Sequence, residues 1–253
     1  MYNDLFSIGG LTVHGYGLMI GLGFLAAIWL GQYRAKKFGL NPDDIINIGM
    51  LVIVLGFAGG KLLHIITNFE LFLDKPLEVL GSEGFVVYGG LLTGVLSGAV
   101  YCKIKKLDFL AHFDLVMPSV ALAQGFGRIG CFLAGCCYGR ATDSFLGVTF
   151  PRGSLAPAGV KVLPTQLFSS IGDFALTLVL IWYAKRAKKG NTGAMYFVLY
   201  GIGRFIVEYF RDDERGTVGI FSTSQFISIF FVLAGVLIFI WNARRKISTT
   251  DVE

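Results

Sequence analysis

The chain has 253 residues, of which 54% are hydrophobic and only 15% carry a charged side chain. Soluble domains hold about 45–50% apolar and about 25% charged residues, so this balance argues against a soluble fold and favours a protein that crosses a membrane several times. The net charge of +5 could suggest nucleic-acid binding, but the basic residues form short clusters between apolar runs, which is instead the pattern of membrane topology.

Apolar runs long enough to cross a bilayer recur along the chain, since about 20 residues span the hydrocarbon core. They are predicted at about 14–33, 46–67, 85–102, 110–134, 166–184, 194–210 and 224–242. We therefore expect an all-α integral membrane protein with about seven transmembrane helices, forming a single polytopic membrane domain over residues 1–253.

The charges between the runs predict the direction of the chain. Basic clusters follow the first, third, fifth and seventh runs, whereas the other connections mix basic with acidic residues. Because positively charged loops stay in the cytoplasm, the N-terminus is predicted outside and the C-terminus in the cytoplasm. The two long connections, at about 68–84 and 138–164, then lie outside the cell.

Several ionisable side chains lie within the apolar runs and are candidates for a site. Such a group is costly in a membrane and is by default a functional candidate, although a structural ion pair or a snorkelling chain is the alternative. Arg128, Arg204 and Glu208 come late in runs that lead outward. Lys61 lies within the second run, where a structural pair explains it as well as a function does.

The sixth run places its polar residues on one side. Tyr200, Arg204, Glu208 and Arg211 have spacings of four, four and three, and therefore share one helix face. Glu208 is expected to pair with Arg204. Arginine binds phosphate through a planar fork and stays charged, so this outward face suits the anionic headgroup of a phospholipid.

Other polar and small residues open further runs from the same side. Tyr16, Tyr88 and Gln166 open the first, third and fifth runs from the outside. The pairs Gly89–Gly90 and Gly127/Gly130 would let the backbone approach a ligand closely, although helix packing explains any single glycine more simply.

Three of the four cysteines, Cys131, Cys136 and Cys137, fall within seven residues. Packing of small side chains, a disulfide in an oxidising compartment and thiol chemistry are the open explanations. Metal ligation would usually require two well-spaced pairs or a nearby histidine. The sequence has neither arrangement here, so no metal site is predicted.

The stretch Gly127–Arg140 reads Gly-Arg-Ile-Gly-Cys-Phe-Leu-Ala-Gly-Cys-Cys-Tyr-Gly-Arg. It resembles the signature of the prolipoprotein diacylglyceryl transferase family, Gly-Arg-x-Gly-Asn-Phe-x-Asn-Gly-Glu-x-x-Gly-Arg. Further matches occur in the family's order at Tyr16–Met19, Gly89–Leu91, Pro164–Leu167 and Arg204–Arg211. Together the matches cover most of the chain.

The resemblance implies an activity. The family transfers the diacylglyceryl group of phosphatidylglycerol to the lipobox cysteine thiol of a prolipoprotein, with glycerol phosphate leaving. The implied partners are phosphatidylglycerol, the prolipoprotein signal peptide with its lipobox, and membrane lipids, with no nucleic acid. The implied location is the bacterial plasma (inner) membrane, with the active site toward the extracytoplasmic leaflet. No cofactor is expected.

The resemblance also assigns residue roles. Arg128 and Arg204 would stabilise charge on the leaving phosphate, with Glu208 holding Arg204 in place and Tyr88 as a further catalytic candidate. The expected substrate-binding residues are Tyr16, Gly89, Gly90, Arg128, Cys131, Gly139, Arg140, Gln166 and Arg211.

Three positions depart from the family's pattern. Tyr88 stands where the family usually has a histidine, for which a base role is proposed, and Cys131 and Cys136 stand in place of Asn and Glu. Tyrosine is a poor base at neutral pH because its ordinary pKa is about 10. The base therefore stays open, and Tyr88 could instead hydrogen-bond the headgroup. His14, near the outside in the first run, and His64 are candidate substitutes, although an interfacial or packed histidine explains each more simply.

Two other functions compete with this one. Intramembrane arginines also occur in anion or lipid transporters, although the inner halves of these runs are almost entirely apolar. A relative of the family that uses a different thiol acceptor or phospholipid is suggested by Tyr88 and Cys131.

Overall fold

The computed structural model describes residues 4–8, 11–82, 84–213 and 216–250. Its contacts divide the chain into two compact units, Met1–Gly31 with Phe113–Glu253, and Gln32–His112. We describe each unit by itself. The single domain over the whole chain therefore stays a prediction.

Long apolar helices dominate the described part of the chain. The six that are long and apolar enough to cross a membrane are α1 (Gly15–Lys37), α2 (Pro42–Thr67), α5 (Val87–Ile104), α6 (Phe109–Ala134), α7 (Thr165–Ala184) and α9 (Thr223–Thr250). The predicted run 194–210 forms a helix as well, α8 (Asn191–Glu208), which is not among these six. The predicted multi-pass, helical membrane fold is confirmed.

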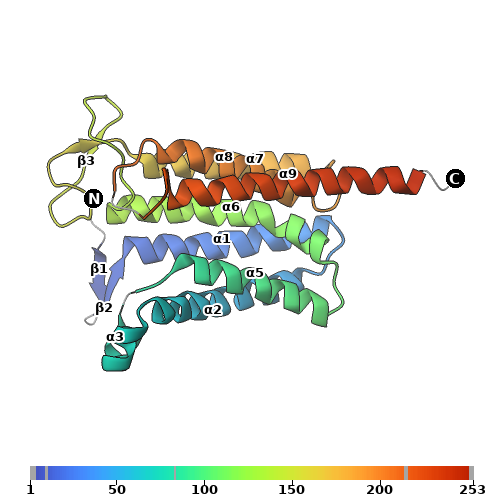
Figure 1. Cartoon of the computed structure of the whole chain (residues 1–253), viewed down its shortest axis with the longest axis horizontal. Helices are drawn as coiled ribbons and strands as arrows, with labels where there is room; N and C mark the ends of the chain where they lie inside the picture. The colour runs from blue at the N-terminus through green and yellow to red at the C-terminus, as the bar shows by residue number, and fades with distance from the viewer. Residues whose placement is uncertain (1–3, 9–10, 83, 214–215, 251–253) are drawn as a thin grey trace. The chain divides into compact units, whose positions relative to one another are not determined.

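In the larger unit, α8 packs along both α7 and α9 (Figure 1). Helix α6 joins them through a buried apolar cluster, formed by Met117 and Ala121 of α6, Leu176 and Leu180 of α7, and Tyr196 of α8. These helices therefore share one core, which fixes the side chains that α6, α7 and α8 direct toward one another.

The start of α8 depends on a residue from α6. Gly190 precedes α8 with a φ of 83°, a left-handed conformation that suits glycine. The Asp114 carboxylate accepts hydrogen bonds from the backbone N–H groups of Gly190 (2.5 Å) and Gly193 (2.7 Å). A carboxylate at this position accepts hydrogen bonds from N–H groups that have no partner within the helix, and its negative charge is stabilised by the positive end of the helix dipole.

The smaller unit is built on close packing of α2 against α5. A Cβ atom on Gly89 would lie 2.4 Å from the Gly59 carbonyl oxygen, so the two backbones meet where neither has a side chain. Helix α2 begins with the Asn41 side chain accepting a hydrogen bond from the Asp43 N–H, followed by Pro42 in the first turn.

The two long connections contain secondary structure of their own. The predicted loop 68–84 includes two short helices, α3 (Phe69–Asp74) and α4 (Pro76–Gly81). The predicted loop 138–164 includes an antiparallel hairpin of β3 (Val148–Thr149) and β4 (Lys161–Val162).

Two further antiparallel hairpins lie before α1 and before α9. They are formed by β1 (Asp4–Ile8) with β2 (Leu11–His14), and by β5 (Thr217–Val218) with β6 (Phe221–Ser222). The all-α prediction is thus correct for the helices that span the membrane and omits these short strands.

Candidate active site

A pocket of about 270 Å³ lies among α6, α7 and α8 in the larger unit. Its lining is mostly apolar and includes Phe168, Leu176, Val179, Leu199 and Val207. Polar side chains converge within this lining: Arg128 from α6, Ser169 and Asp173 from α7, and Tyr200 and Arg204 from α8. An apolar cavity with a few convergent polar groups is the usual form of a ligand site.

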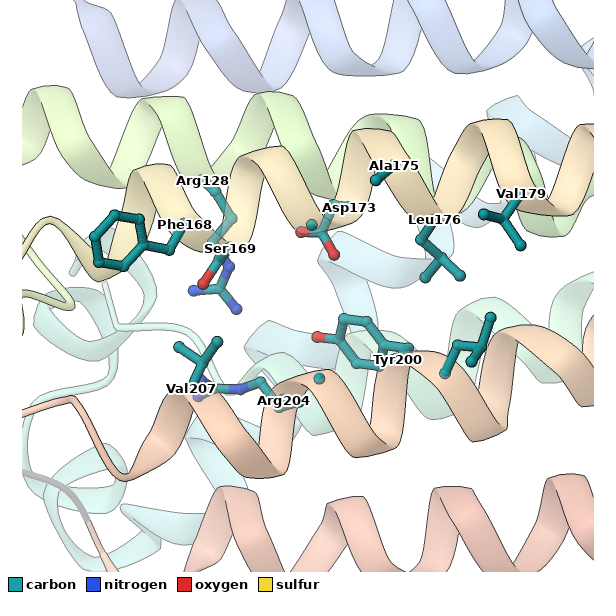
Figure 2. A pocket seen from close by; sticks show the side chains of 13 residues that line it. Arg128, Phe168, Ser169, Asp173, Ala175, Leu176, Val179, Tyr200, Arg204 and Val207 are labelled. Carbon is teal, nitrogen blue, oxygen red and sulfur yellow. The ribbon is translucent and has the colours of Figure 1, made fainter.

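The two arginines face the same space. Figure 2 shows the Arg128 guanidinium directed into the space between α7 and α8 and the Arg204 side chain lying along α8 on the other side of it, with the Tyr200 hydroxyl and the Asp173 carboxylate nearby. Two positive groups in a largely apolar pocket form a strong site for an anion, because the surroundings screen their charges little.

Glu208 connects two of the arginines on one face of α8. Its Oε2 atom lies 3.0 Å from Arg204 Nη1 and 3.6 Å from Arg211 Nη1, and its side chain is only 2% exposed. The i, i+4 pair expected from the sequence is therefore present. The Ser222 hydroxyl donates to Glu208 Oε1 (2.7 Å), and Arg204 Nη2 donates to Ser224 Oγ (2.9 Å).

Arg211 is held by two acidic side chains, Glu208 and Asp213. Its Nε and Nη2 atoms donate to the two carboxylate oxygens of Asp213 at 3.0 Å and 2.7 Å. Asp213 forms a bidentate pair with Nε and Nη2, and Glu208 lies near Nη1, so each of the three guanidinium nitrogens has an acidic partner. Arg211 is not among the residues that line the pocket, so its predicted contact with substrate stays a prediction.

The cysteine-rich turn follows α6. Gly135 and Cys137 both adopt left-handed backbone conformations, with φ values of 75° and 61°. The Sγ atoms of Cys131, Cys136 and Cys137 all lie within 4.8 Å of one another. Hydrogen bonds with the Cys131 and Cys136 thiols, helped by the positive charge of Arg211, lower the pKa of the Cys137 thiol below its usual value.

Two side chains at the start of α7 hold this turn. The Thr165 hydroxyl donates to the Cys137 carbonyl oxygen and the Gln166 Nε2 atom donates to the Cys136 carbonyl oxygen, both at 2.7 Å. Gln166 was expected to bind substrate. Its amide holds the backbone of the cysteine turn, and its contact with substrate stays a prediction.

Gly139 and Arg140 belong to the connection after the turn. A Cβ atom on Gly139 would lie 2.8 Å from the carbonyl oxygens of both Leu163 and Phe210, so glycine is required there for backbone packing. Arg140 is exposed, and its backbone N–H donates to the Phe210 carbonyl oxygen at 2.9 Å. Neither residue lines the pocket.

Tyr16 lies in the first turn of α1 and packs on α6. A Cβ atom on Gly130 would lie 3.2 Å from the Tyr16 ring, so the glycine makes room for it. The three thiols of the cysteine turn and the Arg128 guanidinium are electrostatic neighbours of the Tyr16 hydroxyl. Tyr16 and Cys131 are therefore close to the predicted arginine site, although neither lines the pocket itself.

Other candidates lie in the smaller unit. Tyr88 is 45% exposed at the start of α5, and Gly89 and Gly90 pack against the α2 backbone. Their participation in the arginine site stays a prediction. Lys61 has a structural role, since its ammonium donates to the Ser82 carbonyl oxygen at 2.7 Å.

The two histidines considered as bases have local partners. His14 Nδ1 lies 2.6 Å from the Asp4 carboxylate on the first hairpin, and His64 Nδ1 lies 3.3 Å from the Asn68 side-chain amide nitrogen. Neither histidine lines the pocket.

The structure adds one acidic residue that the sequence reasoning missed. Asp173 is only 7% exposed and lines the pocket that Arg128 and Arg204 also line. The same signal that identified the arginines, a charge within an apolar run, also applied to Asp173. Ser222 and Ser224, which support Glu208 and Arg204, carried no such signal.

Comparison with known proteins identifies the family to which the sequence is similar. The model of the family described as "Prolipoprotein diacylglyceryl transferase" matches residues 3–241. A Clostridium tetani protein named "Phosphatidylglycerol--prolipoprotein diacylglyceryl transferase" is 49% identical over 245 residues, which cover 96% of this chain and 98% of that relative.

Two further relatives match over a similar length. A Clostridium perfringens protein named "Phosphatidylglycerol--prolipoprotein diacylglyceryl transferase 2" is 50% identical over 242 residues, 94% of each chain. A Clostridioides difficile transferase is 31% identical over 251 residues, 98% of each chain. This chain therefore belongs to the prolipoprotein diacylglyceryl transferase family.

Proposed function

We propose that this chain transfers the diacylglyceryl group of phosphatidylglycerol to the lipobox cysteine thiol of prolipoproteins, releasing glycerol phosphate. The observation that carries the proposal is the identity of about half of all residues, over nearly the whole length, to relatives named for this activity. The arginine pocket supports it, because the reaction requires a phosphate-binding site within a membrane protein.

The chemistry places a specific demand on the pocket. The acceptor sulfur, as a thiolate, forms a bond to the terminal glyceryl carbon while the bond from that carbon to the phosphate oxygen breaks. The electron pair of that bond leaves with glycerol phosphate. Negative charge therefore grows on the leaving group, and positively charged donors fixed in position stabilise it most.

Arg128 and Arg204 supply those donors in the proposed reaction. Arg204 is fixed by Glu208 at 3.0 Å and by Ser224 at 2.9 Å, so little reorganisation is required when the phosphate arrives. The apolar lining of the pocket, such as Leu176 and Val179, suits the first carbons of the lipid chains. The remaining acyl chains would lie in the surrounding membrane.

The proposed orientation puts this site toward the extracytoplasmic leaflet, with the N-terminus outside and the C-terminus inside. The alternation of basic clusters along the sequence supports it. A fluorescent protein fused after residue 253 should be fluorescent in the cytoplasm, whereas alkaline phosphatase fused there should be inactive. The opposite pair of results would reverse the orientation.

A second candidate function keeps the chemistry and changes the acceptor thiol or the donor phospholipid. Tyr88, Cys131 and Cys136 replace residue types that the family signature contains, which favours a relative specialised for a different thiol or phospholipid. The two candidates differ in whether the chain can process ordinary prolipoproteins in a cell.

Complementation separates the two candidates. The chain, and its Tyr88→His variant, would be expressed in a bacterium depleted of its own transferase, and lipid-modified prolipoprotein would be measured by gel mobility and mass spectrometry. The proposed function predicts rescue by the unmodified chain. Rescue by Tyr88→His alone would favour the specialised relative. Failure of both, with the proteins present in the membrane, would overturn the proposal.

A further inference from the structure

The cysteine turn has the geometry of a site for a thiophilic metal ion. Cys131, Cys136 and Cys137 are free thiols whose Sγ atoms all lie within 4.8 Å of one another. A zinc–sulfur bond of about 2.3 Å in tetrahedral geometry separates pairs of sulfur atoms by about 3.8 Å. The three sulfurs are therefore at most about 1 Å farther apart than in such a site, a difference that small rotations of the cysteine side chains can remove.

The backbone around these thiols is held in an unusual conformation. Cys137 has a φ of 61°, which costs a residue other than glycine about 1–3 kcal/mol and persists only where its surroundings enforce it. Thr165 and Gln166, both 1% exposed, bind the Cys137 and Cys136 carbonyl oxygens. Strain of this kind is concentrated at functional sites.

The nearby charges suit a metal bound to thiolates. Three thiolates and a divalent cation carry a net charge of −1, which is costly to bury unless it is balanced. Arg128 lies one helical turn before Cys131 on α6, and both Arg211 and Arg128 are charged neighbours of the Cys137 thiol. The guanidinium groups therefore compensate the charge of the filled site.

The ligand set selects the type of metal. Thiolates without carboxylate or imidazole partners favour soft or borderline cations, of which zinc is the usual choice in proteins. Structural zinc sites have four protein ligands, whereas catalytic sites have three and keep one position for water or substrate. The group formed by Cys131, Cys136 and Cys137 contains three ligands.

We propose that Cys131, Cys136 and Cys137 bind one Zn²⁺ ion and that its fourth position takes the acceptor thiol as a thiolate. The second half of this inference rests on the proposed function. It assigns the activation of the thiol to the metal in a chain that has Tyr88 where the family usually has a histidine.

The step balances in atoms and charge. Binding of the acceptor thiol to Zn²⁺ releases its proton to water, as metal binding to thiols generally does. The bound sulfur then donates an electron pair to the glyceryl carbon, and the carbon–oxygen bond breaks with its pair leaving on glycerol phosphate. The thioether product is a neutral, weaker ligand, so it dissociates and water returns to the metal.

Metal binding is measured on the full chain in detergent, without reference to activity. The protein is reduced, stripped with a chelator, equilibrated with Zn²⁺, and analysed for bound zinc and for Zn²⁺ affinity. One zinc per chain is expected. Changing Cys131, Cys136 or Cys137 to Ser should weaken binding by about 100-fold or more, since loss of a supporting residue alone costs about 10- to 100-fold.

Cys102→Ser is the matched control, because Cys102 is a buried free thiol in α5, outside the cluster. It should bind zinc like the unmodified chain. Replacement of Zn²⁺ by Co²⁺ in the unmodified chain should produce a sulfur-to-cobalt charge-transfer band, a test that does not depend on whether the serine variants fold.

Zinc content no greater than that of the triple serine variant, or a Co²⁺ spectrum without a charge-transfer band, would overturn the site. A disulfide in the purified protein, with no zinc uptake after its reduction, would also overturn the site.

Transfer activity that survives complete removal of zinc would overturn the role in thiol activation and leave the proposed function intact. Zinc binding in a protein that transfers no lipid would overturn the proposed function and leave the metal site.

Discussion

At the scale of single residues, Arg128 is the group on which the pocket depends. It is the lining residue that α6 contributes, and it faces Arg204 across the pocket. Its fork can bind two phosphate oxygens at once, which a lysine cannot do. Loss of this group should therefore reduce the rate of transfer more than it reduces the stability of the fold.

Arg128→Ala should lower the rate of diacylglyceryl transfer by about 100- to 1,000-fold, the range measured when a donor to a developing oxyanion is removed. The rate is measured with phosphatidylglycerol in mixed micelles and a lipobox peptide. Arg152→Ala is the control, because Arg152 is an exposed arginine in the connection 138–164. Retention of more than half of the activity by folded Arg128→Ala would contradict this role.

Glu208 should matter for both stability and transfer. Glu208→Gln leaves the buried Arg204 and Arg211 guanidinium groups without a charge that lies 3.0 Å and 3.6 Å away. Breaking a buried ion pair costs about 3 kcal/mol. The variant should unfold at a clearly lower denaturant concentration than Glu70→Gln, a change at an exposed position. Equal midpoints for the two variants would show that the pair contributes nothing.

The negative charge of Asp173 should weaken the binding of an anionic lipid headgroup in the pocket. Its carboxylate lines the same cavity as the two arginines, so Asp173→Asn removes a negative charge that repels the lipid phosphate. The KM for phosphatidylglycerol should fall about threefold to tenfold. A fall in kcat with unchanged KM would contradict this role and identify Asp173 as a proton acceptor.

The sequence could predict the arginines and their partner but not every contact. A charge within an apolar run identifies Arg128 and Arg204, and a spacing of four predicts the Arg204–Glu208 pair. The role of Gln166 could not be predicted, because hydrogen bonding to the Cys136 carbonyl oxygen depends on how α7 meets the turn after α6. Residue type alone does not determine which acceptor is nearest.

At the scale of elements, the start of α8, the helix that carries Arg204, is tied to α6. Asp114 of α6 fixes that start through the N–H groups of Gly190 and Gly193. Removal of the carboxylate leaves the beginning of α8 without a partner for these groups.

Asp114→Ala should destabilise the protein by about 1–2 kcal/mol, the cost of losing a helix cap with its charge. Asp143→Ala, at an exposed position in the connection 138–164, serves as control. Both are compared by chemical unfolding in detergent. A change within 0.3 kcal/mol of the control, on the order of ordinary surface substitutions, would show that the cap is dispensable.

The elements themselves were predictable to different degrees. Long apolar runs predict the membrane helices because helix length and hydrocarbon thickness match. The hairpin of β3 and β4 was missed, since each strand has only two residues and no alternating pattern can develop. Helices α3 and α4 were missed for a similar reason, with six residues each.

At the scale of the whole molecule, composition and charge distribution predict a multi-pass membrane protein, and the relatives extend that to the family. The substrates follow from the proposed function. The choice of acceptor thiol stays a prediction, tied to Tyr88 and to the cysteine turn, where the sequence departs from the family signature. No pattern of hydrophobicity carries that information.

The most direct measurement is transfer by the purified chain. Phosphatidylglycerol labelled in its glyceryl and acyl groups is incubated with the protein and a lipobox peptide, and the peptide is analysed by mass spectrometry. The proposed function predicts a peptide heavier by one diacylglyceryl group on its cysteine, with one glycerol phosphate released for each, and about 100- to 1,000-fold slower product formation with Arg128→Ala. An unmodified peptide, from protein that is folded and embedded in lipid, would contradict it.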